Sequence, residues 1–288
     1  MTSPRAPDAP AFSSVPQPVP TLLRDLVHEH TGSYFETDRL DLMLDKLQPR
    51  LAATGSATFL NYFYLLKYDQ GAAQEWRRVM DAFSVQETYF WREFDQIRAL
   101  VDEVVPRWFR GTTAPLRIWS AACATGEEPY TIAMALEEGG WGRHPIEIIA
   151  SDASEAALAK AREAVYRERS FRALPADLRA KYFESRAGGE GLRRSLADRV
   201  TFRWANLVNP ATYSEIGDVH VIFCRNVFIY FSTEAIRRVA AAFSRQLTGD
   251  GYLFIGASES LLKLTDRFEL QDVRGAFAYM PAAEGGSR

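Results

Sequence analysis

Two adjacent glutamates, Glu127 and Glu128, stand directly after a tight turn that joins an apolar stretch to a helical one. A strand, a turn and a helix in this order begin many nucleotide-binding domains, where three glycines let a pyrophosphate approach the helix N-terminus. Here the three positions hold Ala121, Cys123 and Gly126, so only the last glycine is present. The helix dipole stabilises carboxylates at this place, and those carboxylates would repel a phosphate. The turn therefore favours a ligand that lacks phosphate and tolerates acids, and S-adenosylmethionine, with its sulfonium and ammonium groups, is such a ligand.

A further acid, Asp152, follows the next apolar stretch of the chain. An acid at the end of the second strand holds the ribose hydroxyls in many nucleotide-binding folds. Two ordinary roles compete with ligand binding. Glu127 and Glu128 can simply stabilise the helix end, and Asp152 or Ser154 can cap the helix that follows. Because the turn and the acid occur together, we interpret Asp152 as a ribose ligand.

Asn226 and Tyr230 lie in a second loop of suitable chemistry, after the apolar stretch His220–Cys224. Ligands of open α/β sheets bind beyond the carboxyl ends of the strands. An amide and a phenol at such a place can hold a ligand by hydrogen bonds. Taken alone, these two residues are slightly more typical of a turn asparagine and a core tyrosine.

The elements that would position these residues alternate along the chain. Apolar runs predict strands at Leu116–Ser120, Ile146–Ser151, Val200–Arg203, Val219–Cys224 and Tyr252–Ile255. Helical patterns predict helices at about 91–106, 127–138, 154–164, 175–183 and 232–247. This alternation predicts an α/β fold with a doubly wound, mostly parallel sheet and right-handed crossovers. A hairpin predicted around Asp272–Gly275 adds an antiparallel edge, which is more typical of S-adenosylmethionine-dependent methyltransferases than of dehydrogenases.

The chain divides into segments of different pattern. Residues 1–20 are rich in Pro, Ala and Ser and predict a disordered tail, and residues 282–288 predict another. Residues 21–82 predict a small all-helical N-terminal domain. Residues 83–281 carry the strand–helix alternation and predict the methyltransferase domain, with a short insert near 184–199.

The composition is that of an ordinary globular protein, with 47% hydrophobic residues, 25% charged residues and a net charge of -3. This charge gives no reason to expect a nucleic-acid partner. The two cysteines and four histidines form no metal-binding motif, so we predict neither a disulfide framework nor a metal site. The sequence shows no signal peptide and no apolar run of spanning length, so we expect a cytoplasmic protein without membrane insertion.

The charge is distributed unevenly along the sequence. The stretch from Lys160 to Arg203 contains twice as many basic as acidic residues, whereas the remainder is acidic. Such a segment suggests a docking face for an acidic partner. A solvated, Arg-rich helical face is an equally good interpretation.

Five short motifs, taken together, resemble one protein family. In order they are SVQETYFWRE, WSAACATGEEPYTIAMAL, ASDAS, WANL and FCRNVFIYFS. From about residue 21 to residue 281 the sequence resembles the CheR-type chemotaxis receptor methyltransferases, which are protein-glutamate O-methyltransferases. The resemblance implies methyl transfer from S-adenosylmethionine to glutamates on the cytoplasmic helices of chemoreceptors, for sensory adaptation. The products would be glutamate methyl esters and S-adenosylhomocysteine.

The resemblance also assigns roles to individual residues. Those that match the cofactor-binding positions of the family are Gln86, Thr88, Arg92, Glu128, Asp152, Asn206, Leu207, Asn226 and Val227. Asp152 matches the ribose ligand. Asn206 and Leu207 match the residues that flank adenine, and Asn226 and Val227 match those near the methionine portion.

Arg92 and Tyr230 match the residues beside the transferred methyl group, and we expect them to be the catalytic pair. The sequence departs from the usual family pattern at Gln86, where an Asn is common, and at Ala122 and Ala124, where a Gly and a Ser are common. None of these departures removes a carboxylate or the Arg–Tyr pair, so we expect activity to be retained.

An acidic, Glu-rich receptor helix is the partner that the resemblance implies. Basic residues that would dock it electrostatically are Arg167, Arg169, Arg172, Arg193 and Arg194. Some members of the family also carry a β-insert that grips a peptide at the receptor C-terminus. The insert near 184–199 is a few residues short, so we predict weak or absent tethering, which a tight complex with such a peptide would contradict.

Two other functions remain open at this point. One is a non-catalytic signalling module that senses the cofactor or another nucleotide, and the other is a small-molecule methyltransferase. The missing glycines disfavour a nicotinamide oxidoreductase. The sequence leaves open which receptor is served, which glutamates are modified and how many copies of the chain assemble.

Overall fold

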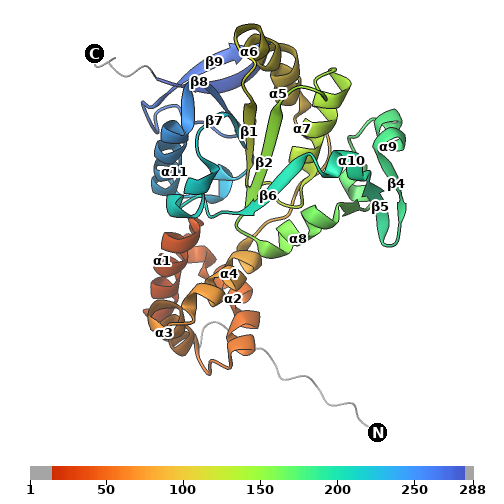
Figure 1. Cartoon of the computed structure of the whole chain (residues 1–288). Coiled ribbons are helices and arrows are strands. Elements are labelled where there is room, and N and C mark those ends of the chain that lie inside the picture. Colours follow the sequence, from red (N-terminus) through yellow and green to blue (C-terminus); the bar gives the residue numbers. More distant parts are fainter. Residues whose placement is uncertain (1–14, 283–288) are drawn as a thin grey trace. The chain divides into compact units, whose positions relative to one another are not determined.

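The computed structural model describes residues 15–282, which form two compact units that divide between Phe83 and Ser84 (Figure 1). The tails predicted for the two ends of the chain fall largely on residues 1–14 and 283–288, which lie outside the described residues. Within residues 15–282, no helix combines the length and the apolar character that a membrane crossing requires.

The first unit is built from helices. Its α-helices within the described residues are α1 (Val19–Thr31), α2 (Leu40–Thr54), α3 (Phe59–Tyr68) and α4 (Ala72–Phe83). Helix α1 begins inside the segment predicted as a tail, because Val19 is buried and Pro20 is well suited to a first helical turn. The predicted tail therefore extends too far into the chain. Gly32, in the left-handed conformation, ends the helix.

A buried carboxylate ties three of these helices together. Glu75 of α4 accepts two hydrogen bonds from Arg50 of α2, at 2.7 and 3.0 Å, and one from the phenol of Tyr62 in α3, at 2.6 Å. Burial and this carboxylate raise the pKa of Tyr62, so the phenol remains a donor. A charge-assisted pair of this geometry fixes the packing of the helices that carry it.

The second unit contains a seven-stranded sheet in the order β6-β2-β1-β7-β8-β10-β9. Its strands are β1 (Leu116–Ala121), β2 (Ile146–Asp152), β6 (Val200–Trp204), β7 (Val219–Cys224), β8 (Leu247–Ile255), β9 (Phe268–Val273) and β10 (Ala276–Pro281). Strand β10 is antiparallel to both of its neighbours, and the other pairs are parallel. The predicted α/β fold, with its mostly parallel sheet and antiparallel edge, is confirmed.

Helices cover both faces of this sheet (Figure 1). The α-helices of the second unit, within the described residues, are α5 (Phe94–Ala99), α6 (Val105–Gly111), α7 (Glu127–Glu138), α8 (Glu155–Glu163), α9 (Ala176–Tyr182), α10 (Arg194–Ala197) and α11 (Thr233–Gln246). Because successive strand residues point to opposite faces, Ile118 belongs to the core with α5, α7 and α8, whereas Trp119 belongs to the core with α11. This is the doubly wound arrangement.

The helix predicted at 91–106 differs from the observed one. Helix α5 begins only at Phe94, because Trp91 and Glu93 have positive φ angles of 68° and 46°, which a right-handed helix excludes. A π-helical turn at Leu100–Val104 then joins α5 to α6. The three residues before Phe94 are thus an irregular loop, and the contacts that hold them are found at the candidate site.

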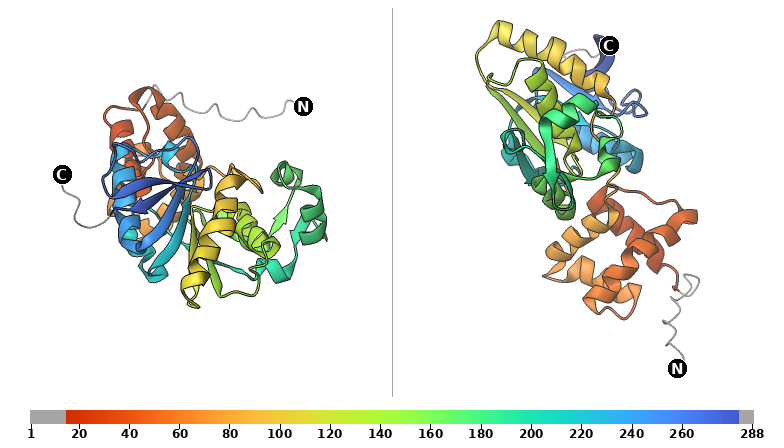
Figure 2. Two further views of the ribbon diagram at one scale, coloured as in Figure 1. Left: turned by 90° about the horizontal axis from the view of Figure 1, so that it is seen from above. Right: turned by 90° about the vertical axis from the view of Figure 1, so that its right-hand side faces the viewer.

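The predicted insert corresponds to a second, small sheet. Strands β3 (Val165–Tyr166), β4 (Phe183–Arg186) and β5 (Gly189–Leu192) form it, with β5 in the centre. Gly188 and Gly189, both with positive φ, make the tight turn between β4 and β5. The two strands lie with α9 at the side of the second unit that is remote from α11 (Figures 1 and 2).

Candidate active site

A strained turn lies where the carboxyl ends of β1 and β2 run side by side. Ala122 and Ala124 have positive φ angles of 61° and 47°, a conformation that costs a residue with a side chain roughly 1–2 kcal/mol. At Gly126, φ is 92° and an added Cβ would lie 3.0 Å from the Cβ of Ala161, so both the angle and the space favour glycine. Strain of this kind is concentrated at functional sites.

Asp152, at the end of β2, holds this turn in place. Its carboxylate accepts a hydrogen bond from the backbone N–H of Ala124 at 2.9 Å and another from that of Ser154 at 2.8 Å. Ser154 caps α8, since its hydroxyl accepts from the N–H of Ala157 at 3.0 Å. The interpretation of Asp152 as the helix cap is therefore wrong. A carboxylate offers about four acceptor positions, so Asp152 can support the turn and still accept from a ligand.

The two glutamates of the motif have different surroundings. Glu127 is buried and accepts hydrogen bonds from the hydroxyls of Thr125, at 2.6 Å, and Ser170, at 2.9 Å. Glu128 accepts from the hydroxyl of Ser120 at 2.7 Å and lies 3.5 Å from a guanidinium nitrogen of Arg225. Burial raises the pKa of both carboxyls. For Glu128 the positive charge of Arg225 partly opposes that rise.

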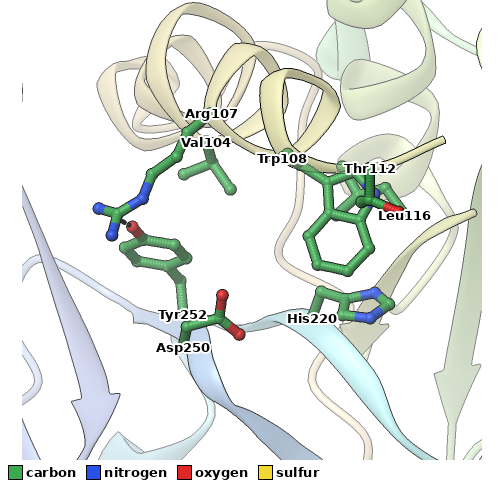
Figure 3. Close-up of a pocket in the computed structure, with 9 residues that line it drawn as sticks. Val104, Arg107, Trp108, Thr112, Leu116, His220, Asp250 and Tyr252 are labelled. Carbon is green, nitrogen blue, oxygen red and sulfur yellow. Dashed lines mark hydrogen bonds between the residues drawn. The ribbon is translucent and has the colours of Figure 1, made fainter. Parts of the chain in front are cut away.

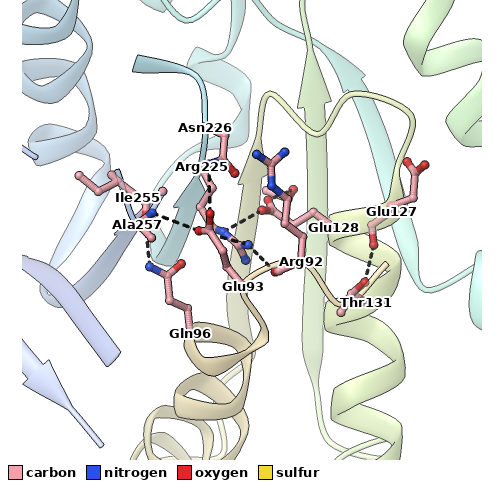
Figure 4. Close-up of polar contacts among 12 residues, drawn as sticks. Arg92, Glu93, Gln96, Glu127, Glu128, Thr131, Arg225, Asn226, Ile255 and Ala257 are labelled. Carbon is pink, nitrogen blue, oxygen red and sulfur yellow. Dashed lines mark hydrogen bonds and ion pairs between the residues drawn. The ribbon is translucent and has the colours of Figure 1, made fainter. Parts of the chain in front are cut away.

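The sequence interpretation missed Arg225, the residue at the centre of this arrangement (Figure 4). Its side chain is only 2% exposed and lies between two carboxylates, 3.5 Å from Glu128 and 3.7 Å from Glu93. It also donates a hydrogen bond to the backbone carbonyl of Arg92. Its Nε and Nη1 atoms have no hydrogen-bond partner within the described residues. The available signal was a charged residue directly after a buried strand.

Glu93 fixes the loop that carries Arg92. Its carboxylate accepts hydrogen bonds from the side-chain amide of Asn226 at 3.2 Å and from the backbone N–H of Ala257 at 3.1 Å. These contacts and the ion pair with Arg225 hold Glu93 in its left-handed conformation. The N-terminal end of α5 is thereby joined to the loops that follow β7 and β8.

Glu259 is a second residue that the sequence interpretation missed. Its carboxylate accepts from the backbone N–H groups of Asn226 at 2.9 Å, Gly256 at 2.6 Å and Ile229 at 3.3 Å. Asn226 itself has a positive φ of 60°. Glu259 therefore shapes the whole loop after β7 through its backbone, and this loop leads to Tyr230.

The predicted catalytic pair consists of a half-buried residue, Arg92, and an exposed one, Tyr230. Arg92 donates a hydrogen bond at 2.5 Å to the backbone carbonyl of Glu87. Tyr230 ends the short turn Phe228–Tyr230, and the residue is 41% exposed. The core-tyrosine interpretation of Tyr230 is therefore wrong.

The remaining predicted residues have different surroundings. The amide oxygen of Gln86 accepts from Lys160 at 2.9 Å, and Thr88 is half-buried in the same segment. Asn206 is buried and its side chain accepts from the N–H of Val208 at 3.2 Å. Leu207 and Val227, by contrast, both pack in the core that faces α11. The side-chain amides of Gln86 and Asn226 are thus both engaged by other residues of the chain.

A cavity of about 260 Å³ lies at the opposite, amino ends of the strands (Figure 3). Arg107, Tyr252 and Asp250 form one side of it, and Trp108 and His220 form the other. Burial lowers the pKa of His220. None of the residues predicted to bind cofactor lines this cavity, so it is separate from the candidate active site.

Two family models match the chain. "CheR methyltransferase, SAM binding domain" matches residues 86–277, and "CheR methyltransferase, all-alpha domain" matches residues 21–84. The chain belongs to the CheR methyltransferase family. It is accordingly a methyltransferase whose cofactor is S-adenosylmethionine, as the acidic turn and the motifs predicted.

Named relatives cover most of the chain. It is 36% identical to chemotaxis protein methyltransferase 2 of Vibrio cholerae, over 92% of this chain and 93% of that protein. It is 33% identical to the chemotaxis protein methyltransferase of Escherichia coli, over 86% of each. It is also 32% identical to the "Probable biofilm formation methyltransferase WspC" of Pseudomonas putida, over 88% of this chain and 59% of that protein.

The groups at the strand ends fit this cofactor. A buried carboxyl whose pKa is raised by desolvation, as at Glu128, gains stability when a cationic ligand lies beside it. Arg225 supplies one positive charge to the two carboxylates of Glu93 and Glu128. The remaining negative charge matches the ammonium and sulfonium groups of S-adenosylmethionine and would repel a phosphate.

The raised pKa of Glu127 predicts a pH dependence of stability. Below pH 4.5, its ordinary value, the carboxyl is protonated in both the folded and the unfolded chain. Between this value and the higher pKa of the folded state, the carboxyl loses its proton more readily in the unfolded chain than in the folded one. The free energy of unfolding therefore falls as the pH rises through this range. Glu127→Gln should lose less stability between pH 4.5 and 7 than the wild type, as measured by urea unfolding. Equal pH slopes for the two proteins would contradict this.

The position of Arg225 predicts a large loss of stability on substitution. Arg225→Met keeps most of the side-chain volume but leaves Glu93 and Glu128 without their buried counter-charge. Removing one partner of a buried ion pair costs roughly 3–5 kcal/mol. Denaturant unfolding should show a loss of this size, whereas Arg238→Met, on the exposed face of α11, should change stability by about 0.5 kcal/mol or less. Similar values for the two variants would show that the ion pairs contribute little.

Proposed function

We propose that this protein methylates glutamate side chains on the cytoplasmic helical region of chemoreceptors, giving glutamate methyl esters and S-adenosylhomocysteine for sensory adaptation. The observation that carries the proposal is the combination of a largely buried carboxylate at Glu128 with the half-buried Arg92 and the exposed Tyr230. The names of the Vibrio and Escherichia relatives support the assignment to chemotaxis. A receptor substrate of this kind places the protein in the cytoplasm.

In this proposal the strand ends hold the cofactor. Asp152 accepts from the ribose hydroxyls, and Glu128 binds positively charged or donor groups of the methionine portion. Asn206 and Leu207 flank the adenine. The backbone of Asn226 and Val227 lies along the methionine portion, since the Asn226 side chain is engaged by Glu93.

Thr88 and Gln86 complete the proposed cofactor pocket from the segment before Arg92. Gln86 would have to release its contact with Lys160 in order to present its amide oxygen. That contact is an exposed hydrogen bond, and such bonds contribute only about 0.5–1.5 kcal/mol net. The rearrangement is therefore a small one.

The reaction needs positioning more than acid–base chemistry. When bound, the cofactor supplies a methyl group on a positively charged sulfur, which is open to in-line displacement. A glutamate has a reference pKa of about 4.3 and is an ionised nucleophile at neutral pH without a general base. Both charges diminish in the transition state, so a water-poor pocket does not penalise it. Holding the two reactants in line can contribute roughly 7–11 kcal/mol.

Arg92 and Tyr230 are suited to this positioning. A guanidinium can orient a carboxylate by two parallel hydrogen bonds, and a phenol can direct one oxygen with a weaker one. The backbone of Arg92 is held in place, because its carbonyl accepts a hydrogen bond from the buried Arg225. Its side chain therefore begins from a fixed point of the backbone.

The WspC relative indicates that members of this family are named for more than one signalling output. The chemistry proposed here would be the same for any acidic receptor helix. The choice of receptor is the part of the proposal that rests most heavily on the two chemotaxis relatives. Weak or absent tethering of a receptor C-terminal peptide by the β4–β5 hairpin remains a prediction.

The proposed roles of Arg92 and Tyr230 predict a specific kinetic signature. Arg92→Ala and Tyr230→Phe should lower kcat at least about tenfold while changing cofactor affinity much less, because an interaction made mainly in the transition state affects turnover. Methyl esters on a purified receptor fragment, measured with radiolabelled cofactor, report kcat, and calorimetry reports cofactor affinity. Arg238→Ala on α11 is the control. Wild-type turnover in both variants would contradict the assignment.

The proposed role of Asp152 predicts the opposite signature. Asp152→Ala should weaken cofactor binding by about 10- to 100-fold, the effect of losing roughly 1.4–2.7 kcal/mol of hydrogen bonding, and saturating cofactor should restore most of kcat. Because Asp152 also supports the turn through Ala124, a thermal unfolding scan must accompany the calorimetry. A folded variant with unchanged cofactor affinity would refute the ribose assignment.

A further inference from the structure

A cluster of exposed positive charge lies next to Arg92. Arg169 and Arg172, in and just after the turn Glu168–Phe171, both form ion pairs with the carboxylate of Glu87, and the distance from Arg172 is 2.8 Å. The side chains of Arg169, Arg172 and Glu87 are 70%, 39% and 43% exposed. The cluster is therefore accessible from solvent.

Arg92 is physically joined to this cluster. Its guanidinium donates to the backbone carbonyl of Glu87 at 2.5 Å and lies 5.6 Å from the ring centroid of Tyr89. Arg172 stacks on the same ring, with its guanidinium carbon 3.7 Å from the centroid. Three guanidinium groups thus surround residues 87–89, and within residues 15–282 the carboxylate of Glu87 forms ion pairs with two of them. The group carries a net positive charge.

The framework of the cluster does not depend on the Glu87 side chain. The backbone N–H of Phe90 donates to the carbonyl of Ser170 at 2.9 Å, which joins the two segments directly. The ring of Phe90 is fully buried and stacks on Phe171, with the ring centroids 5.6 Å apart. The arginines would therefore stay in place if the carboxylate of Glu87 were replaced by another one.

Three of the other basic residues of this stretch are engaged locally. Arg194 pairs with Asp198 at 2.8 Å, one turn further along, and Arg186 pairs with Glu184 at 2.7 Å. The side chain of Arg167 donates to the carbonyl of Gly188. The sequence predicted a broad basic docking face that included Arg167 and Arg194. The structure concentrates the charge adjacent to Arg92 at Arg169 and Arg172.

We propose that Arg169 and Arg172 form a subsite for a second carboxylate of the substrate, one that accompanies the glutamate being methylated, and that Glu87 occupies this subsite when substrate is absent. Exposed ion pairs contribute little to stability, so an incoming carboxylate exchanges with Glu87 at little cost. The partner is an acidic helical segment of a protein, and this inference rests on the proposed function. The subsite selects the substrate without contacting the cofactor.

The test compares substitutions on the two sides of the ion pairs. Arg169→Gln/Arg172→Gln should raise the KM for a receptor cytoplasmic fragment about tenfold, and Glu87→Gln should lower it about two- to threefold. Cofactor affinity should stay unchanged in both. The KM is taken from initial rates of methyl-ester formation at low ionic strength, where exposed charges are screened least. Arg186→Gln/Arg194→Gln removes the same charge from the same stretch and should leave KM within about twofold.

The sign of the Glu87→Gln effect separates this proposal from a purely structural role. If the arginines only hold the segment around Glu87, breaking the pairs from either side has the same consequence, and Glu87→Gln should raise KM as well. That outcome would overturn the inference, as would equal KM increases in the control and test double variants. If the wild type forms no methyl esters on the receptor fragment at all, the proposed function itself fails.

Discussion

The guanidinium of Arg225, buried between the carboxylates of Glu93 and Glu128, is the contact on which the candidate site depends. It joins the end of β7, the loop before α5 and the first turn of α7, which are far apart in the sequence. Its bond to the carbonyl of Arg92 fixes the backbone from which that side chain extends. One buried cation between two partly buried carboxylates also leaves a net negative charge among these three groups.

The distribution of charge matches the proposed methylation of glutamate. The interior of the site is negative, which suits a cofactor with a sulfonium and an ammonium group, and desolvation strengthens the preference. The rim is positive at Arg92, Arg169 and Arg172, which suits a carboxylate substrate. Neither surface requires a metal or a general base, because the nucleophile is already ionised and the electrophile is already charged. The protein orients the two reactants, and its charges favour the cationic cofactor inside the site and the carboxylate at the rim.

The sequence predicted the parts of the fold that depend on local pattern. The strands of the large sheet were predicted from their apolar runs. Ser154 was named beside Asp152 as a possible cap of the following helix, and it is the residue that caps α8. The sequence did not predict the irregular loop at 91–93, in which Trp91 and Glu93 have positive φ angles, because Glu93 is held there by contacts with distant loops. Arg225 and Glu259 were missed for the same reason. Their partners are brought together only by the order of the strands.

A structure of the protein with S-adenosylhomocysteine bound would test the central claim most directly. The account predicts the ribose hydroxyls on Asp152, the adenine beside Asn206 and Leu207, and the sulfur facing a space bounded by Arg92 and Tyr230. An adenosine bound elsewhere, or a sulfur remote from Arg92 and Tyr230, would contradict it.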